Sequence, residues 1–199
     1  AMNGNFTGSQ AKDADSKKDL MGPVVYSVKL PAAGIGIDFG ANGYFGGNRA
    51  KTNKYIVNTM GVADSINVGD YLNKNWVGGE IQIFADILGG LAVKGEYMAG
   101  VNSSVSTITS TATMAQKKAD PNKIKNFSGY YVYLIKNIGQ RNQMVARYDY
   151  YDPNTKLSGD AAKNDLFYKT LTLSWQHYLN DFIRVSLNYE MPKNETNAT

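Results

Sequence analysis

The sequence predicts an all-β fold, an antiparallel up-and-down β-barrel of the transmembrane kind. Its 199 residues include 20 Gly, 14 Tyr and 7 Phe but only 5 Pro, a composition that favours strands and turns. Apolar and polar side chains alternate along several stretches, as they do on the two faces of a strand. Tight turns and long polar connections alternate down the chain, which is typical of transmembrane barrels.

The first half of the chain predicts two hairpins. Residues 22–30 (GPVVYSVKL) and 34–45 (GIGIDFGANGYF) alternate and are joined by a short connector. A polar segment, residues 46–75, follows as a long loop. Residues 76–87 (WVGGEIQIFADI) and 91–100 (LAVKGEYMAG) then form the second hairpin around the turn LGG.

The second half predicts two more hairpins after a loop over residues 102–126. Residues 129–138 (GYYVYLIKNI) pair with residues 143–151 (QMVARYDYY), although both faces of the first stretch are partly apolar and its facing stays open. The last hairpin joins KTLTLSWQ, which begins at Lys169, to FIRVSLNYEM, which ends at Met191. The chain is therefore a single domain, or a segment of one, with loops over 1–21 and 192–199 and about eight strands over 22–191.

Charged side chains recur in mid-strand on the polar parity, and a water-filled lumen would tolerate them. The predicted pore-lining residues are Lys29, Asp38, Glu80, Lys94, Glu96, Arg147, Asp149, Arg184 and Glu190. The opposite parity is apolar and would face lipid. The predicted lipid-facing residues are Ile35, Ile37, Ile81, Ile83, Val93, Leu171, Leu173, Ile183, Val185 and Leu187.

Aromatic residues on the apolar parity lie near the predicted strand ends. They are Tyr97, Tyr148, Tyr150, Trp175 and Tyr189. Amphipathic rings of this kind suit the boundary between membrane and water. Together with the alternating loop lengths, they favour a barrel over a soluble β-sandwich, which also buries one face of each strand.

Several classes of chemistry receive no support. The net charge is +4 without a dense basic block, so no nucleic-acid partner is expected. The chain has no Cys and a single His, His177, and we therefore expect no metal site and no cofactor. Glu80 and Glu96 could work as a glycosidase pair, but charged lumen residues balanced by Lys94 explain them more economically. No convergent catalytic set is found, and an enzyme is not expected.

Three stretches carry a family resemblance. Residues 143–160 (QMVARYDYYDPNTKLSGD), 178–191 (YLNDFIRVSLNYEM) and 78–100 (GGEIQIFADILGGLAVKGEYMAG) resemble the C-terminal half of a phosphate-selective-porin-like protein of the Bacteroidetes type. The resemblance implies a Gram-negative outer-membrane barrel of about 16 strands. Such proteins usually finish with one more strand, which is missing after Met191, and the chain is expected to be part of a longer one.

The expected function is passive diffusion of small hydrophilic solutes or ions, anions included, through an outer-membrane channel. Phosphate selectivity is not carried over from the family, because the chain has only four Arg and the predicted lumen mixes both signs of charge. Expected partners are outer-membrane lipid or detergent, the permeating solutes, and further copies or a larger membrane complex. The alternatives are a non-transporting barrel subunit of a surface assembly and a soluble β-sandwich binding protein.

Overall fold

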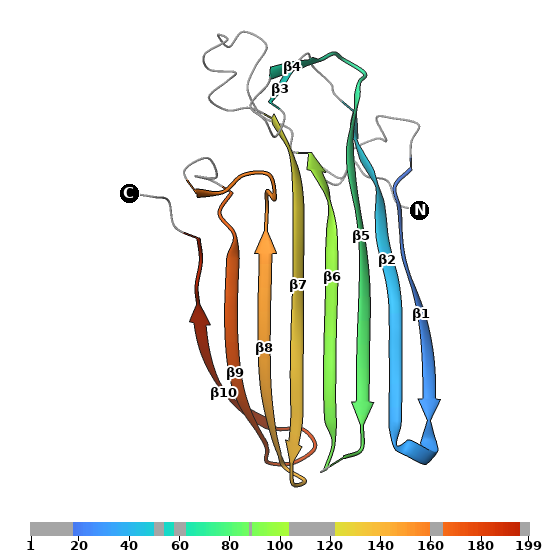
Figure 1. Ribbon diagram of the computed structural model, residues 1–199, viewed down its shortest axis with the longest axis vertical. Helices are drawn as coiled ribbons and strands as arrows, with labels where there is room; N and C mark the ends of the chain where they lie inside the picture. The colour runs from blue at the N-terminus through green and yellow to red at the C-terminus, as the bar shows by residue number, and fades with distance from the viewer. Residues whose placement is uncertain are drawn as a thin grey trace.

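The structure is a computed structural model, and it shows one β-sheet with eight long antiparallel strands in its main path (Figure 1). The residues it describes are 18–49, 54–57, 63–87, 89–103, 122–159 and 165–195. The long strands are β1 Leu20–Leu30, β2 Ile35–Arg49, β5 Tyr71–Ala85, β6 Leu91–Ser103, β7 Asn122–Ile138, β8 Asn142–Asp152, β9 Tyr168–Tyr178 and β10 Arg184–Pro192. In the described part of the chain, no helix is long and apolar enough to cross a membrane.

The four predicted hairpins are confirmed. The sheet order is β1-β2-β5-β6-β7-β8-β9-β10, so each long strand lies beside its neighbours along the chain. A 3-10 turn, Pro31–Ala33, joins β1 to β2, and Gly34 closes it with a φ of 62°. Gly139 has a φ of 66° in the β7–β8 turn. Such left-handed backbone is where glycine is least strained, and the tight turns all gather at one end of the sheet (Figure 1).

The strands run further on the long-loop side than the alternation predicted. β2 extends to Arg49, β5 begins at Tyr71 and β7 begins at Asn122. Two short strands, β3 Lys54–Val57 and β4 Ala63–Ile66, pair with each other inside the segment expected to be a loop, and β3 also pairs with β7. These extensions were missed because Gly and Asn residues weaken the apolar alternation while the backbone ladder continues.

The described strands form an open sheet. β1 and β10 lie at opposite edges (Figure 1). Leu72 is the one large hydrophobic side chain counted as buried in the described residues, at 6% exposure. A β-sandwich buries the inner faces of two sheets against each other, and the described strands offer no second large sheet. The all-β up-and-down prediction is therefore confirmed, and a sandwich does not describe this arrangement.

Candidate pore-lining face

The register divides the side chains of the eight long strands between two faces. Directly paired residues of neighbouring antiparallel strands project from the same face. One face, here the apolar face, carries the even residues of β1, β7 and β8 and the odd residues of β2, β5, β6, β9 and β10. The other face is the polar face. The open question of β7 is thereby answered: Tyr130, Val132 and Leu134 belong to the apolar face.

The structure places the two predicted residue sets on opposite faces. All nine candidate pore-lining residues lie on the polar face: Lys29, Asp38, Glu80, Lys94, Glu96, Arg147, Asp149, Arg184 and Glu190. Nine of the ten candidate lipid-facing residues lie in strands on the apolar face. The tenth, Ile183, directly precedes β10 and accepts a backbone hydrogen bond from Leu179, which continues the β9–β10 register.

The apolar face carries no charge through its centre. A row across the sheet there pairs Ile37, Ile83, Val93, Leu134, Ala146, Leu173 and Tyr189. In the long strands, the charged members of this face lie near the ends: Arg49, Asp152 and Lys169 towards the long loops, and Lys136 towards the turns. Many of its large side chains are exposed, including Leu173 at 44% and Leu187 at 69%, and others such as Ile37 and Val93 are half-buried.

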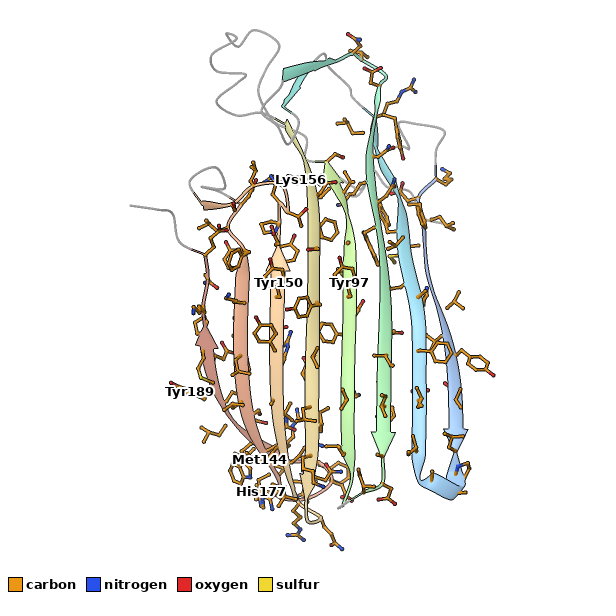
Figure 2. All side chains as sticks on the ribbon, in the orientation of Figure 1. Tyr97, Met144, Tyr150, Lys156, His177 and Tyr189 are labelled. Atoms are coloured by element: carbon orange, nitrogen blue, oxygen red, sulfur yellow. The ribbon has the colours of Figure 1, made fainter. Side chains whose placement is uncertain are left out.

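A tyrosine row, Tyr97, Tyr130 and Tyr150, borders the uncharged band on the long-loop side. The three are direct register partners, and the rings of Tyr130 and Tyr150 stack with centroids 5.3 Å apart. Tyr97 and Tyr150 lie at the same level of the sheet (Figure 2). At the turn end, Trp175 stacks on His177, with centroids 5.7 Å apart. Sequence analysis missed Tyr130, because the facing of its strand could not be decided.

Beyond the tyrosine row the apolar face becomes polar. Asn75 pairs with Val101, which pairs with Asn126, and Ser128 pairs with Asp152. On the polar face at this level lie Tyr44 and its partner Trp76, whose neighbour is Gly100. A Cβ on Gly100 would come within 2.5 Å of the Trp76 Cβ, so glycine allows this close approach.

Two adjacent rows of the polar face carry most of its mid-strand charge. In the first row, Glu80 pairs with Glu96, Glu96 with Tyr131, and Tyr131 with Asp149. Glu96 accepts hydrogen bonds from Asn42 Nδ2 at 3.0 Å and from the Tyr131 hydroxyl at 2.8 Å. These two donors hold the Glu96 carboxylate in place.

In the second row, Asp38 pairs with Gln82, and Lys94 and Arg147 both pair with Tyr133. The cations of this row lie on aromatic rings. The Arg147 guanidinium lies 5.0 Å from the centroid of the Tyr133 ring, and the Lys94 ammonium lies 5.3 Å from that of Phe84. Arg147 Nη2 also lies 2.5 Å from Asp149 Oδ1. The ring contacts restrain both basic side chains, and the ion pair restrains Arg147 further.

A concavity of about 630 Å³ lies at the turn end of the sheet. Its lining includes Lys29, Gly36, Phe84 and Lys94 from the polar face. Within the described residues, no group of three or more His, Cys, Asp or Glu side chains is placed to hold a metal ion. The polar face thus carries charges of both signs, and two of them, Lys29 and Lys94, line the concavity at the turn end.

A buried polar cluster holds the β8–β9 connection against the long-loop end of β7. Asp165, at 3% exposure, pairs with Lys125 Nζ and accepts a hydrogen bond from Asn154 Nδ2 at 3.1 Å. The backbone N–H of Thr155 donates to the carbonyl of Asn126 at 2.8 Å. Sequence analysis missed this cluster, because Lys125 and Asp165 are 40 residues apart and no spacing rule joins them.

Comparisons of the chain with protein-family models, with curated proteins and with solved structures gave no significant match. The function of the chain is therefore inferred from the two faces of the sheet and from the residues they carry.

Proposed function

We propose that the chain forms part of an outer-membrane β-barrel channel, through which small hydrophilic solutes and ions diffuse passively. The apolar face would contact lipid, and the polar face would line a water-filled lumen. The observation that carries this proposal is the segregation of charge, with the nine candidate pore-lining charges on one face and a band without charge across the centre of the other. A bilayer and a lumen are the two environments that such a sheet separates in transmembrane barrels.

The size of the uncharged band supports lipid as its environment. Eight strands spaced about 4.8 Å apart make the band roughly 34 Å wide. From Tyr150 to Met144 it spans six residues, or about 20 Å along the strand at ~3.3 Å per residue. The resulting area of roughly 700 Å² exceeds the ~300–600 Å² of the largest apolar patch on a typical soluble monomer.

Lipid also requires that every strand edge be paired, because hydrocarbon supplies no hydrogen-bond partners. β1 runs towards the turn end and β10 runs away from it (Figure 1). Further strands placed between these two edges can therefore continue the antiparallel order. This agrees with the resemblance to barrels of about 16 strands, in which tight turns lie on the periplasmic side and long loops on the extracellular side.

Conductance across planar bilayers tests the proposal directly. The full-length protein, purified in detergent, is expected to insert and to give stepwise ion currents. A detergent-stable protein that inserts without conducting, and that co-purifies with a stoichiometric partner, would instead identify a barrel subunit of a surface assembly. A monomer that stays soluble without detergent would overturn the membrane location altogether.

Neutralising the carboxylate row is expected to change the ion preference of the channel. In the variant with Glu80→Gln and Glu96→Gln, two directly paired negative charges leave the polar face, and their amides keep the side-chain size. Rings of Asp or Glu favour cations in channels, so the reversal potential in a salt gradient should move towards anions. Leu173→Ile, a change confined to the apolar face, is the control and should leave the reversal potential unchanged. An unchanged potential in the double glutamine variant would show that this row does not face the ion path.

A further inference from the structure

We propose that Lys169 and Lys193 bind the phosphate group of an anionic membrane lipid, in the leaflet on the side of the long loops. This inference rests on the proposed function, because it requires the apolar face to lie in a bilayer. It adds a lipid-binding site at the outer edge of that face, at residues that have no part in the permeation path.

The two lysines are direct neighbours on the apolar face. Lys169 lies in β9, and the backbone N–H of Lys193, one residue after β10, donates to the Lys169 carbonyl at 2.8 Å. This bond continues the β9–β10 register, in which directly paired residues project from the same face. Lys169 also pairs with Tyr150, and the two lysines therefore extend the tyrosine row at the boundary of the uncharged band.

Two carboxylates, Asp152 and Glu195, lie at the same end of the apolar face as the lysine pair, and each is engaged by other groups. The Asp152 carboxylate accepts a hydrogen bond from the backbone N–H of Asn154 at 2.9 Å. Glu195, the nearest carboxylate along the strand, accepts hydrogen bonds from the backbone N–H groups of Gly159 at 2.6 Å and Phe167 at 3.2 Å. In contrast, Lys136, at the turn end of the same face, lies 3.3 Å from the Gly90 carbonyl. Among the described residues, neither Lys169 nor Lys193 has an ion pair with a carboxylate.

The surroundings fit a lipid phosphate. Like charges directly opposite on neighbouring strands repel each other, and an anion between the two ammonium groups would relieve that repulsion. The Lys169 ammonium lies 5.1 Å from the centroid of the Phe167 ring, and that ring lies 5.7 Å from Tyr150. Tyr150 lies at the level of Lys169, and Phe167 lies two residues towards the long loops, so aromatic side chains border the basic pair where a lipid headgroup would lie. Lysines at such positions extend their ammonium groups to the headgroup layer.

Native mass spectrometry of the full chain, released from vesicles, measures the predicted binding. The vesicles contain phosphatidylcholine alone or mixed with phosphatidylglycerol. The wild-type chain is expected to retain phosphatidylglycerol selectively. The Lys169→Gln, Lys193→Gln variant should retain it roughly tenfold less, since each basic residue near a membrane surface contributes several-fold to anionic-lipid binding. Lys169→Arg with Lys193→Arg should restore retention.

The matched control removes two other lysines from the long-loop side. Lys74→Gln with Lys156→Gln deletes the same charge, from the polar face and from the β8–β9 connection (Lys156, Figure 2), and should leave retention at the wild-type level. Equal retention in both glutamine variants would overturn the site, even if the protein conducts. If inorganic phosphate at equal concentration displaced phosphatidylglycerol, the ligand of the lysine pair would be free phosphate and not a lipid. Failure of the wild-type chain to enter vesicles would overturn the proposed function as well.

Discussion

Replacing Leu173 with arginine is expected to lower the free energy of unfolding from a bilayer by about 2–4 kcal/mol, the cost of an arginine at the lipid-facing midplane of a barrel. Leu173 lies in the central row of the apolar face, with Ala146 and Tyr189 as its direct partners. An arginine there must either lose its hydration or distort the lipid around it. Urea unfolding in phospholipid vesicles, followed by the fluorescence of the two tryptophans, measures the change.

The matched control is one residue away. Thr172→Arg introduces the same side chain on the polar face, in the row of Arg147 and Glu190. There it would meet water, and the expected change is within about 0.5 kcal/mol, as for surface substitutions. Similar losses at both positions would contradict the assignment of the faces to lipid and lumen.

Replacing Lys125 with methionine is expected to destabilise the β8–β9 connection by about 3 kcal/mol, roughly the cost of removing one partner of a buried ion pair. Asp165 would keep the hydrogen bond from Asn154 but lose the ion pair with Lys125. Hydrogen exchange at Thr155 and Leu157, whose N–H groups donate to Asn126 and Asn154, should accelerate by about two orders of magnitude, since ~1.4 kcal/mol corresponds to tenfold.

Two variants separate loss of the pair from loss of a lysine. Lys156→Met removes an exposed lysine from the same connection and should leave the exchange rates unchanged. Adding Asp165→Leu to Lys125→Met removes the Asp165 carboxylate as well. Much of the protection against hydrogen exchange should then return, because replacement of both buried partners by apolar residues is often nearly neutral. If exchange accelerated in the Lys156→Met variant but not in the Lys125→Met variant, Lys125 would not be the residue that stabilises this connection.

Local alternation predicted the strands that face two different environments. In residues 22–30 and 34–45 one parity is apolar and the other is mostly polar or small, and the pairing of β1 with β2 places the apolar parities of both strands on one face. β7 could not be assigned in the same way, because Tyr131, Tyr133 and Ile135 place apolar atoms on the polar face as well. Its facing is fixed by pairing with β6 and β8, which no single-strand pattern contains.

The candidate site, too, could be predicted only in part. The charged residues of the polar face were predictable, because parity within a strand is a local property. Their grouping was not, since Glu80 meets Glu96, and Arg147 lies over Tyr133, only through the register between strands. Lys193 was expected in a loop, and its place beside Lys169 depends on a backbone bond that no local pattern predicted.

In the proposed membrane location, the strands that continue past the tyrosine row would expose a single face to two solvents. In β7, Asn126 and Leu134 share the apolar face and are eight residues apart, on either side of Tyr130. In the proposed barrel the tyrosines lie at the membrane boundary, so water would select the side chain at the first position and hydrocarbon would select it at the second. Tolerance to substitution along this face is therefore a function of depth as well as parity, and a substitution scan of one strand would trace the surface of the membrane.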